Sequence, residues 1–151
     1  MSKKLQTEVD CFEEYKMIAI VSHLKDYTLC YHINLRFDFD FIKYDDMDGI
    51  TPHDDVRRFS WYYYKDDISR TVFYLMGNKC ESGYLLQSQK TVDYFLLIKN
   101  PVSDDLVKSI ATNMRQVTNI SAVFEIDLQK QKNIDSLLET IELHELEVLN
   151  K

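Results

Sequence analysis

The sequence predicts an α+β domain, with a mostly antiparallel sheet of about five or six strands and two or three flanking helices. Short runs rich in β-branched and aromatic residues recur between residues 17 and 128, separated by polar turns. Two segments, 103–117 and 134–149, instead carry apolar residues at helical spacing. A chain of 151 residues has the usual size of one domain. We therefore expect residues 1–151 to form a single α+β domain, with the polar residues 1–14 flexible.

The first half of the chain begins with a strand and then allows two interpretations. Residues 17–21 form a short apolar run that is typical of a buried strand. Residues 27–44 alternate apolar and polar side chains, which favours a strand, but they are too many for one ordinary strand. Asp26 suits the start of a short helix. We predict a helix from Asp26 to about Asn34 and a strand over 37–44, followed by an acidic loop over 45–55.

The middle of the chain predicts paired strands. Residues 59–65 and 70–76 flank Asp66 and Asp67, which favours an antiparallel hairpin. A turn over 78–83 and a short strand over 83–86 follow. Residues 92–98 are the most apolar stretch of their length and predict a central strand.

The C-terminal third predicts two helices around a strand. Ser103 suits a helix N-cap, and Asp104 and Asp105 suit the first turn. Residues 122–128 alternate in polarity, as expected of a strand near a sheet edge. The last helix, 134–149, has an apolar stripe wider than one core requires, because Leu143 and Leu146 extend it. This width predicts a partner helix or a subunit contact.

Composition argues against several partners and locations. Acidic residues outnumber basic ones by 25 to 18, and this net charge of −7 disfavours nucleic acid or an anionic membrane as the main partner. The three cysteines contain no CxxC pair and are expected to be reduced thiols. The first apolar run is too short for a signal peptide or a membrane span. We expect a cytoplasmic protein without a membrane partner.

No catalytic, metal or cofactor motif withstands inspection. Histidines 23 and 32 lie near Cys30, but without a recognised ligand spacing. The acidic run beginning at Asp45 fails the calcium-loop pattern at Met47 and Ile50. Only three glycines are present, so phosphate-cradling loops are not expected. The sequence predicts no metal, no cofactor and no catalytic set.

Aromatic residues in the predicted hairpin form the first candidate binding surface. Trp61, Tyr62 and Tyr64 are open to three interpretations: core packing, a protein interface, or a face that stacks nucleic-acid bases. The negative charge and the neighbouring aspartates favour core packing first and a protein interface second.

Asp93 and Tyr94 form the second candidate site. A carboxylate in the most apolar strand is costly unless it is exposed or hydrogen-bonded. Asp93 is therefore either a strand-end residue that caps nearby backbone or, with Tyr94, part of a small polar binding site.

The same stretch carries a family resemblance. Residues 90–100, Lys-Thr-Val-Asp-Tyr-Phe-Leu-Leu-Ile-Lys-Asn, resemble the signature of the uncharacterised bacterial IPExxxVDY family. Val92, Asp93 and Tyr94 match the VDY half of that signature. Where the signature has Ile-Pro-Glu, this chain has Leu-Gln-Ser over 86–88. The resemblance implies a shared fold and a bacterial origin, and it implies no activity.

These observations lead to one main functional hypothesis and two rivals. We expect a non-enzymatic cytoplasmic interaction or structural module that binds a protein partner or forms a homo-oligomer, through the last helix or the aromatic hairpin. The first rival is an enzyme whose site is assembled from distant residues such as Asp93, Tyr94 and a histidine. The second is a nucleic-acid binder that uses the aromatic sheet.

Overall fold

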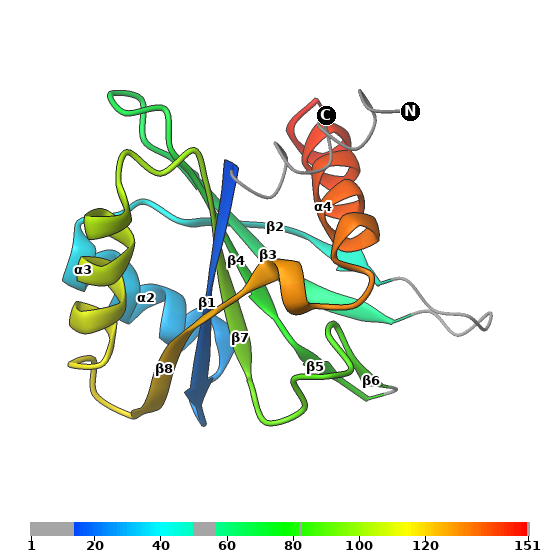
Figure 1. Cartoon of the computed structure of the whole chain (residues 1–151), viewed down its shortest axis with the longest axis horizontal. Coiled ribbons are helices and arrows are strands. Elements are labelled where there is room, and N and C mark those ends of the chain that lie inside the picture. The colour runs from blue at the N-terminus through cyan, green and yellow to red at the C-terminus, as the bar shows by residue number, and fades with distance from the viewer. Residues whose placement is uncertain (1–13, 50–56, 82, 151) are drawn as a thin grey trace.

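Helices cover both faces of one antiparallel sheet in the computed structural model, which describes residues 14–49, 57–81 and 83–150. Figure 1 shows α2 and α3 on one side of the sheet and α4 on the other. The predicted α+β class, with six main strands and three helices, is confirmed. The prediction that residues 1–14 are flexible lies almost wholly outside the described residues.

The helices are α2 (Asp26–Phe37), α3 (Asp104–Met114) and α4 (Ile134–Leu149), with a short 3-10 turn, η1 (Leu128–Lys130), before α4. The main strands are β1 (Tyr15–Ser22), β2 (Ile42–Asp48), β3 (Arg58–Lys65), β4 (Val72–Gly77), β7 (Tyr94–Lys99) and β8 (Ile120–Ile126). A separate ribbon pairs β5 (Lys79–Cys80) with β6 (Gly83–Tyr84).

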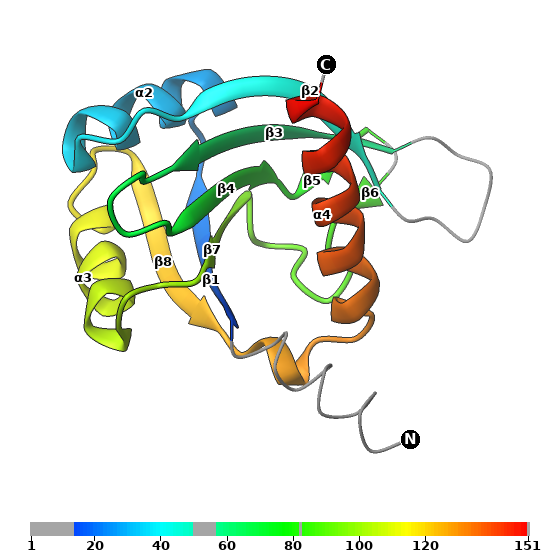
Figure 2. The same ribbon diagram turned by 90° about the horizontal axis from the view of Figure 1, so that it is seen from above.

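The sheet has the order β2-β3-β4-β7-β1-β8, and every neighbouring pair is antiparallel. β7 lies between β4 and β1, so the predicted central strand is confirmed. β8 and β2 are the two edges, as predicted for the strand near residues 122–128. Figure 2 shows β2 along the rim of the sheet, where its end approaches the C-terminal end of α4.

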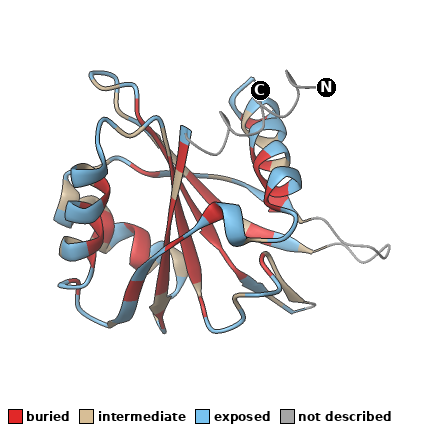
Figure 3. Cartoon of the chain, viewed as in Figure 1, coloured by how far each residue is buried: buried red, intermediate tan, exposed pale blue. Residues whose placement is uncertain are grey.

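Alternating side chains of the central strands build two separate cores. Ile18 and Ile20 face α2 and α3, whereas Met17 and Ala19 face α4. Neighbouring strand residues point to opposite faces of a sheet, so a continuously apolar strand requires cover on both sides. Figure 3 shows this burial concentrated in the central strands and on the inner faces of the helices.

The predicted division of residues 26–44 is wrong in its boundaries. The helix continues beyond Asn34 and ends at Phe37. The C-cap residue that follows, Asp38, has a left-handed φ of 56°. Aspartate tolerates this conformation better than most residues, because its short side chain can bond locally. The next strand, predicted over 37–44, begins only at Ile42 and continues to Asp48. The first four residues of the predicted acidic loop over 45–55 therefore belong to this strand. Residues 50–55 of that predicted loop lie outside the described residues.

Most of the remaining predicted elements are confirmed with small shifts, but the turn predicted over 78–83 contains the short strand β5, and the strand predicted over 83–86 ends at Tyr84. β3 and β4 form the expected hairpin, in which Tyr63 is paired with Tyr74. The Ser103 hydroxyl caps α3 by accepting a hydrogen bond from the backbone N–H of Leu106 at 3.1 Å. The last helix spans 134–149, as predicted.

Candidate functional site: an acidic groove between an edge strand and the last helix

A hollow of about 540 Å³ opens between β2 and α4. β2 and the start of β3 contribute Asp45, Asp46, Met47, Asp48 and Arg58, and α4 contributes Thr140, Leu143, His144, Glu147 and Val148. A second hollow of about 590 Å³ lies beside it and shares Asp45, Asp46 and Val148. We call the two hollows together the β2–α4 groove.

The strand wall of the groove is an open sheet edge. β2 pairs with β3 alone, and no other strand in the described part of the chain lies beside it. Its register with β3 shifts between Tyr44 and Met47, which marks a bulge at Asp45 and Asp46. A bulge bends the strand and re-aims the groups around it. Charged side chains and bulges are also how sheet edges avoid indiscriminate pairing.

The helix wall is fixed to the sheet by tyrosine–glutamate hydrogen bonds. The Tyr15 hydroxyl donates to Glu142, and the Tyr74 hydroxyl donates to Glu145 at 2.5 Å. Burial, followed by these carboxylates, raises the pKa of Tyr15 and of Tyr74 well above the ordinary range. Burial and the charge of Glu145 raise the pKa of Tyr63 to about 12. These hydroxyls are therefore proton donors that hold α4 in place.

His144 joins the two walls. Its Nε2 donates to the backbone carbonyl oxygen of Asp45 at 2.7 Å. Its ring meets the Trp61 ring edge-on, with the ring centroids 4.8 Å apart. Trp61 is completely buried, and its indole N–H has no hydrogen-bond partner within the described residues. His144 thus bonds α4 to the bulge of β2.

Negative charge dominates the groove. Among the described residues, the first hollow is lined by four carboxylates, from Asp45, Asp46, Asp48 and Glu147, and by a single cation, Arg58. Arg58 lies 3.6 Å from Asp48, and both side chains are more than two-thirds exposed. Lys43, in the second hollow, pairs with Asp26 at 3.4 Å. The groove therefore suits a positively charged ligand.

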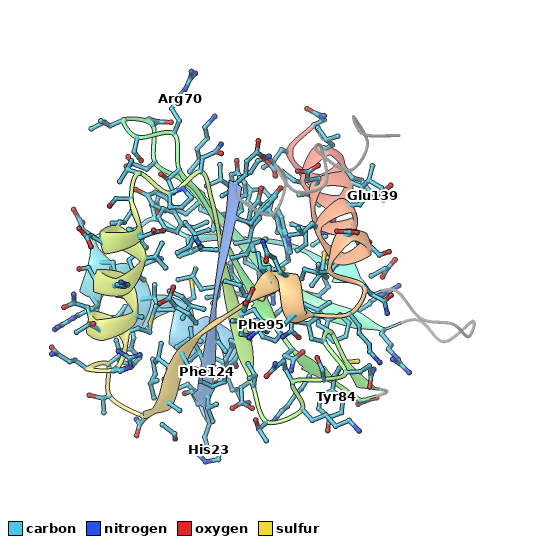
Figure 4. All side chains as sticks on the ribbon, in the orientation of Figure 1. His23, Arg70, Tyr84, Phe95, Phe124 and Glu139 are labelled. Carbon is cyan, nitrogen blue, oxygen red and sulfur yellow. The ribbon has the colours of Figure 1, made fainter. Side chains whose placement is uncertain are left out.

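The helix wall also offers an apolar contact. Leu143 lines the groove with 59% of its surface exposed, whereas Ile141 on the opposite side of α4 is fully buried. Figure 4 shows Glu139 projecting from α4 away from the sheet and Phe95 in the middle of the core. The groove therefore combines carboxylates with one accessible leucine.

Asp93 and Tyr94 lie outside the groove and bond to the backbone where β1 leads into α2. The Asp93 carboxylate accepts a hydrogen bond from the Ser22 N–H at 2.8 Å and pairs with Lys79 at 2.8 Å. The Tyr94 hydroxyl donates to the Leu24 carbonyl oxygen at 2.5 Å. Both groups thus secure the β1–α2 connection, as expected of the strand-end interpretation.

The three aromatic candidates divide between the two cores. Trp61 and Tyr62 are buried, and only Tyr64 is partly accessible. The Tyr62 hydroxyl donates to Asp26 at 2.8 Å, and the Tyr64 ring stacks on Phe73. Core packing is what the structure shows for Trp61 and Tyr62, while an interface at Tyr64 stays a prediction. Two of the three contact groove residues: the Trp61 ring meets those of His144 and Tyr44, and the Lys43 ammonium lies 5.7 Å from the centre of the Tyr62 ring.

Sequence reasoning missed the groove, because its walls lie far apart in the chain. Asp45, Asp46 and Asp48 were expected in a solvated loop, and His144 received no role. One signal was available: Ile42, Tyr44 and Met47 place apolar residues at nearly alternate positions between these aspartates. That pattern indicates a strand with one irregularity.

Comparisons with known proteins add no function. No family model matches the chain, and no curated protein or solved structure is similar to it at a significant level. None of the described helices has the length and apolar character needed to cross a lipid bilayer. Within residues 14–49, 57–81 and 83–150, no cluster of three or more His, Cys, Asp or Glu side chains has metal-binding geometry.

Proposed function

We propose that this protein is a non-enzymatic interaction module that binds an extended, positively charged segment of a partner protein in the β2–α4 groove. The observation that carries the proposal is the groove itself, an acidic hollow beside an unpaired strand edge. A sheet edge flanked by a helix is the geometry in which extended peptides add as an extra strand.

The spacing of the carboxylates suggests the pattern of the ligand. Asp46 and Asp48 are two residues apart on β2, and both line the hollow. Residues two apart in a strand are separated by about 6.8 Å, and the same repeat applies to an extended peptide. Lysine or arginine at alternate positions of the ligand therefore matches these two aspartates. Apolar residues between them would meet the exposed side chain of Leu143.

The titratable groups support binding over catalysis. Strongly shifted pKa values are typical of catalytic acids and bases. The large shifts here belong to tyrosines and to Cys30, and none of these side chains lines the groove. Membership of the IPExxxVDY family and a cytoplasmic location remain predictions, and the proposal depends on neither.

The test is binding of a fluorescein-labelled peptide in which lysine and valine alternate, followed by fluorescence anisotropy. The double variant Asp46→Asn/Asp48→Asn is expected to weaken binding about two- to thirtyfold, because each exposed charge pair contributes roughly 0.2–1 kcal/mol. Adding salt is expected to weaken binding to the wild-type protein, because the groove charges are exposed.

The matched control is Asp67→Asn/Asp105→Asn, which removes two exposed charges outside the groove. It is expected to bind as the wild type does. Equal weakening by both double variants would show that binding follows net charge alone, and the groove proposal would then be abandoned. A peptide in which glutamate and valine alternate is expected not to bind.

A further inference from the structure

α2 carries apolar residues on two opposite faces. Leu29, Cys30 and Ile33 are buried against the sheet. Tyr27 and Tyr31 are 61% exposed and Leu35 is 65% exposed. Residues at i, i+4 and i+8 lie along one side of a helix, so these three form a continuous solvent-facing row, here called the α2 stripe. A surface helix ordinarily has polar residues on its outer face.

No charged side chain interrupts the α2 stripe. The two charged residues of α2 are engaged elsewhere: Asp26 accepts from Tyr62 at 2.8 Å, and Arg36 donates to Gln116, just after α3, at 2.5 Å. Thr28 and His32 lie beside the stripe. By contrast, the exposed side of α3 carries charged residues, Asp104, Asp105 and Lys108. The outer face of α2 is thus unusual within this protein.

We propose that the α2 stripe binds the α2 stripe of a second copy of this chain, with the two helices antiparallel about a two-fold axis near Tyr31. Twofold symmetry makes a surface meet itself, so Tyr31 meets the other Tyr31, and Tyr27 meets Leu35. Tyr27 and Leu35 are eight residues apart, which corresponds to about 12 Å along the helix. Each aromatic ring therefore faces an exposed apolar residue.

Charge supports a second copy as the occupant. The antiparallel arrangement places Lys25, before α2 in one copy, near Asp38 at the end of α2 in the other, and both residues are exposed. It also opposes the two helix dipoles. Each copy carries a net charge of −7, so two copies repel one another over most of their surface. The α2 stripe itself adds no charge to that repulsion.

The size of the stripe sets the strength of the contact. Three side chains of this type and exposure offer roughly 300 Å² per copy, less than half of the about 800 Å² per partner in a standard stable interface. The dimer is therefore weak and forms as the concentration rises. The α2 stripe and the β2–α4 groove lie on different helices on opposite sides of the sheet, so this contact is independent of the proposed function.

The test is sedimentation equilibrium of the full chain over a hundredfold range of concentration. The wild-type protein is expected to show a reversible monomer–dimer equilibrium. Tyr31→Asp is expected to weaken dimerisation at least about tenfold, because a central aromatic residue is a typical hot spot. Lys25→Glu, which faces Asp38 with a like charge, is expected to weaken it to a smaller extent.

The matched control is Leu146→Asp, which changes an exposed leucine on α4. It is expected to dimerise as the wild type does, and circular dichroism verifies that every variant is folded. The inference is overturned if the wild-type protein stays monomeric throughout. It is also overturned if Leu146→Asp abolishes a dimer that Tyr31→Asp leaves intact, because the contact then lies on α4.

Discussion

Replacing Asn78 by alanine is expected to lower the free energy of unfolding by about 4 kcal/mol. Asn78 is completely buried where β4 ends. Its side-chain amide donates to the carbonyl oxygens of Gln89 and Val92 at 2.7 and 2.8 Å. Its side-chain oxygen accepts from the N–H of Leu86 at 2.9 Å. One side chain thereby fixes the loop that connects the small ribbon to β7.

The magnitude follows from what alanine leaves behind. Each of the three hydrogen bonds contributes about 1 kcal/mol net, and a buried backbone group that loses its partner costs about 1–3 kcal/mol. The loop can admit water to some of these groups, which lowers the total. About 4 kcal/mol is a large part of the 5–15 kcal/mol that stabilises a typical domain.

Urea unfolding followed by tryptophan fluorescence measures this change, because Trp61 is the single tryptophan and is buried. The control is Asn113→Ala, which removes surface hydrogen bonds to Arg36 and Ser109 and is expected to cost less than about 1 kcal/mol. A loss below about 1 kcal/mol for Asn78→Ala would refute the reasoning, because the loop would not depend on this side chain.

Three further outcomes are expected. Ser103→Ala removes the cap of α3 and should cost about 1 kcal/mol in thermal unfolding. Ile141→Ala should cost about 3 kcal/mol in urea unfolding, because it leaves a cavity beneath α4, whereas Leu143→Ala should be nearly neutral. Burial raises the pKa of Tyr63 and of Tyr94 from 10.0 to about 12. Their neutral forms therefore stabilise the fold fully below pH 10, and this contribution is lost as the pH rises through 12. A tyrosinate absorbance titration that is complete before unfolding begins would contradict this.

Local patterns were sufficient where one short-range rule decided the structure. The spacing of Ile134, Leu137, Leu138 and Ile141 predicts the last helix, and Ser103 before two aspartates predicts the start of α3. The aromatic hairpin was predictable because both of its strands are neighbours in the sequence.

Residues 26–44 were harder, because two rules conflict there. The alternation that ends in Phe37, Phe39 and Phe41 is typical of a strand, yet Phe37 ends a helix and Phe39 and Phe41 occupy the connection to β2. All three face the core that α2 and β3 share. The alternating phenylalanines therefore reflect packing into one core and do not mark a strand.

The candidate site was beyond sequence reasoning for a different reason. The groove exists because α4 crosses the face of the sheet near β2, and His144 contacts Asp45, 99 residues away. No local sequence pattern in either segment predicts that the two segments are in contact. The run of aspartates in β2 also has the composition of a solvent-exposed turn. Edge strands can carry such charged residues, because much of their surface is exposed.

The order of strands in the sheet has a consequence for how the chain is made. β1 pairs with β7 and β8 only. Ile20, for example, is paired with Tyr94 on one side and with Val123 on the other. The β2–β3 and β3–β4 pairs instead join strands that are consecutive in the sequence. During synthesis from the N-terminus, the apolar β1 strand therefore leaves the ribosome long before either partner exists. Such a segment is prone to aggregate while it is unpaired. The insertion of β7 between β4 and β1 covers one edge of β1, and only the later pairing with β8 covers the other.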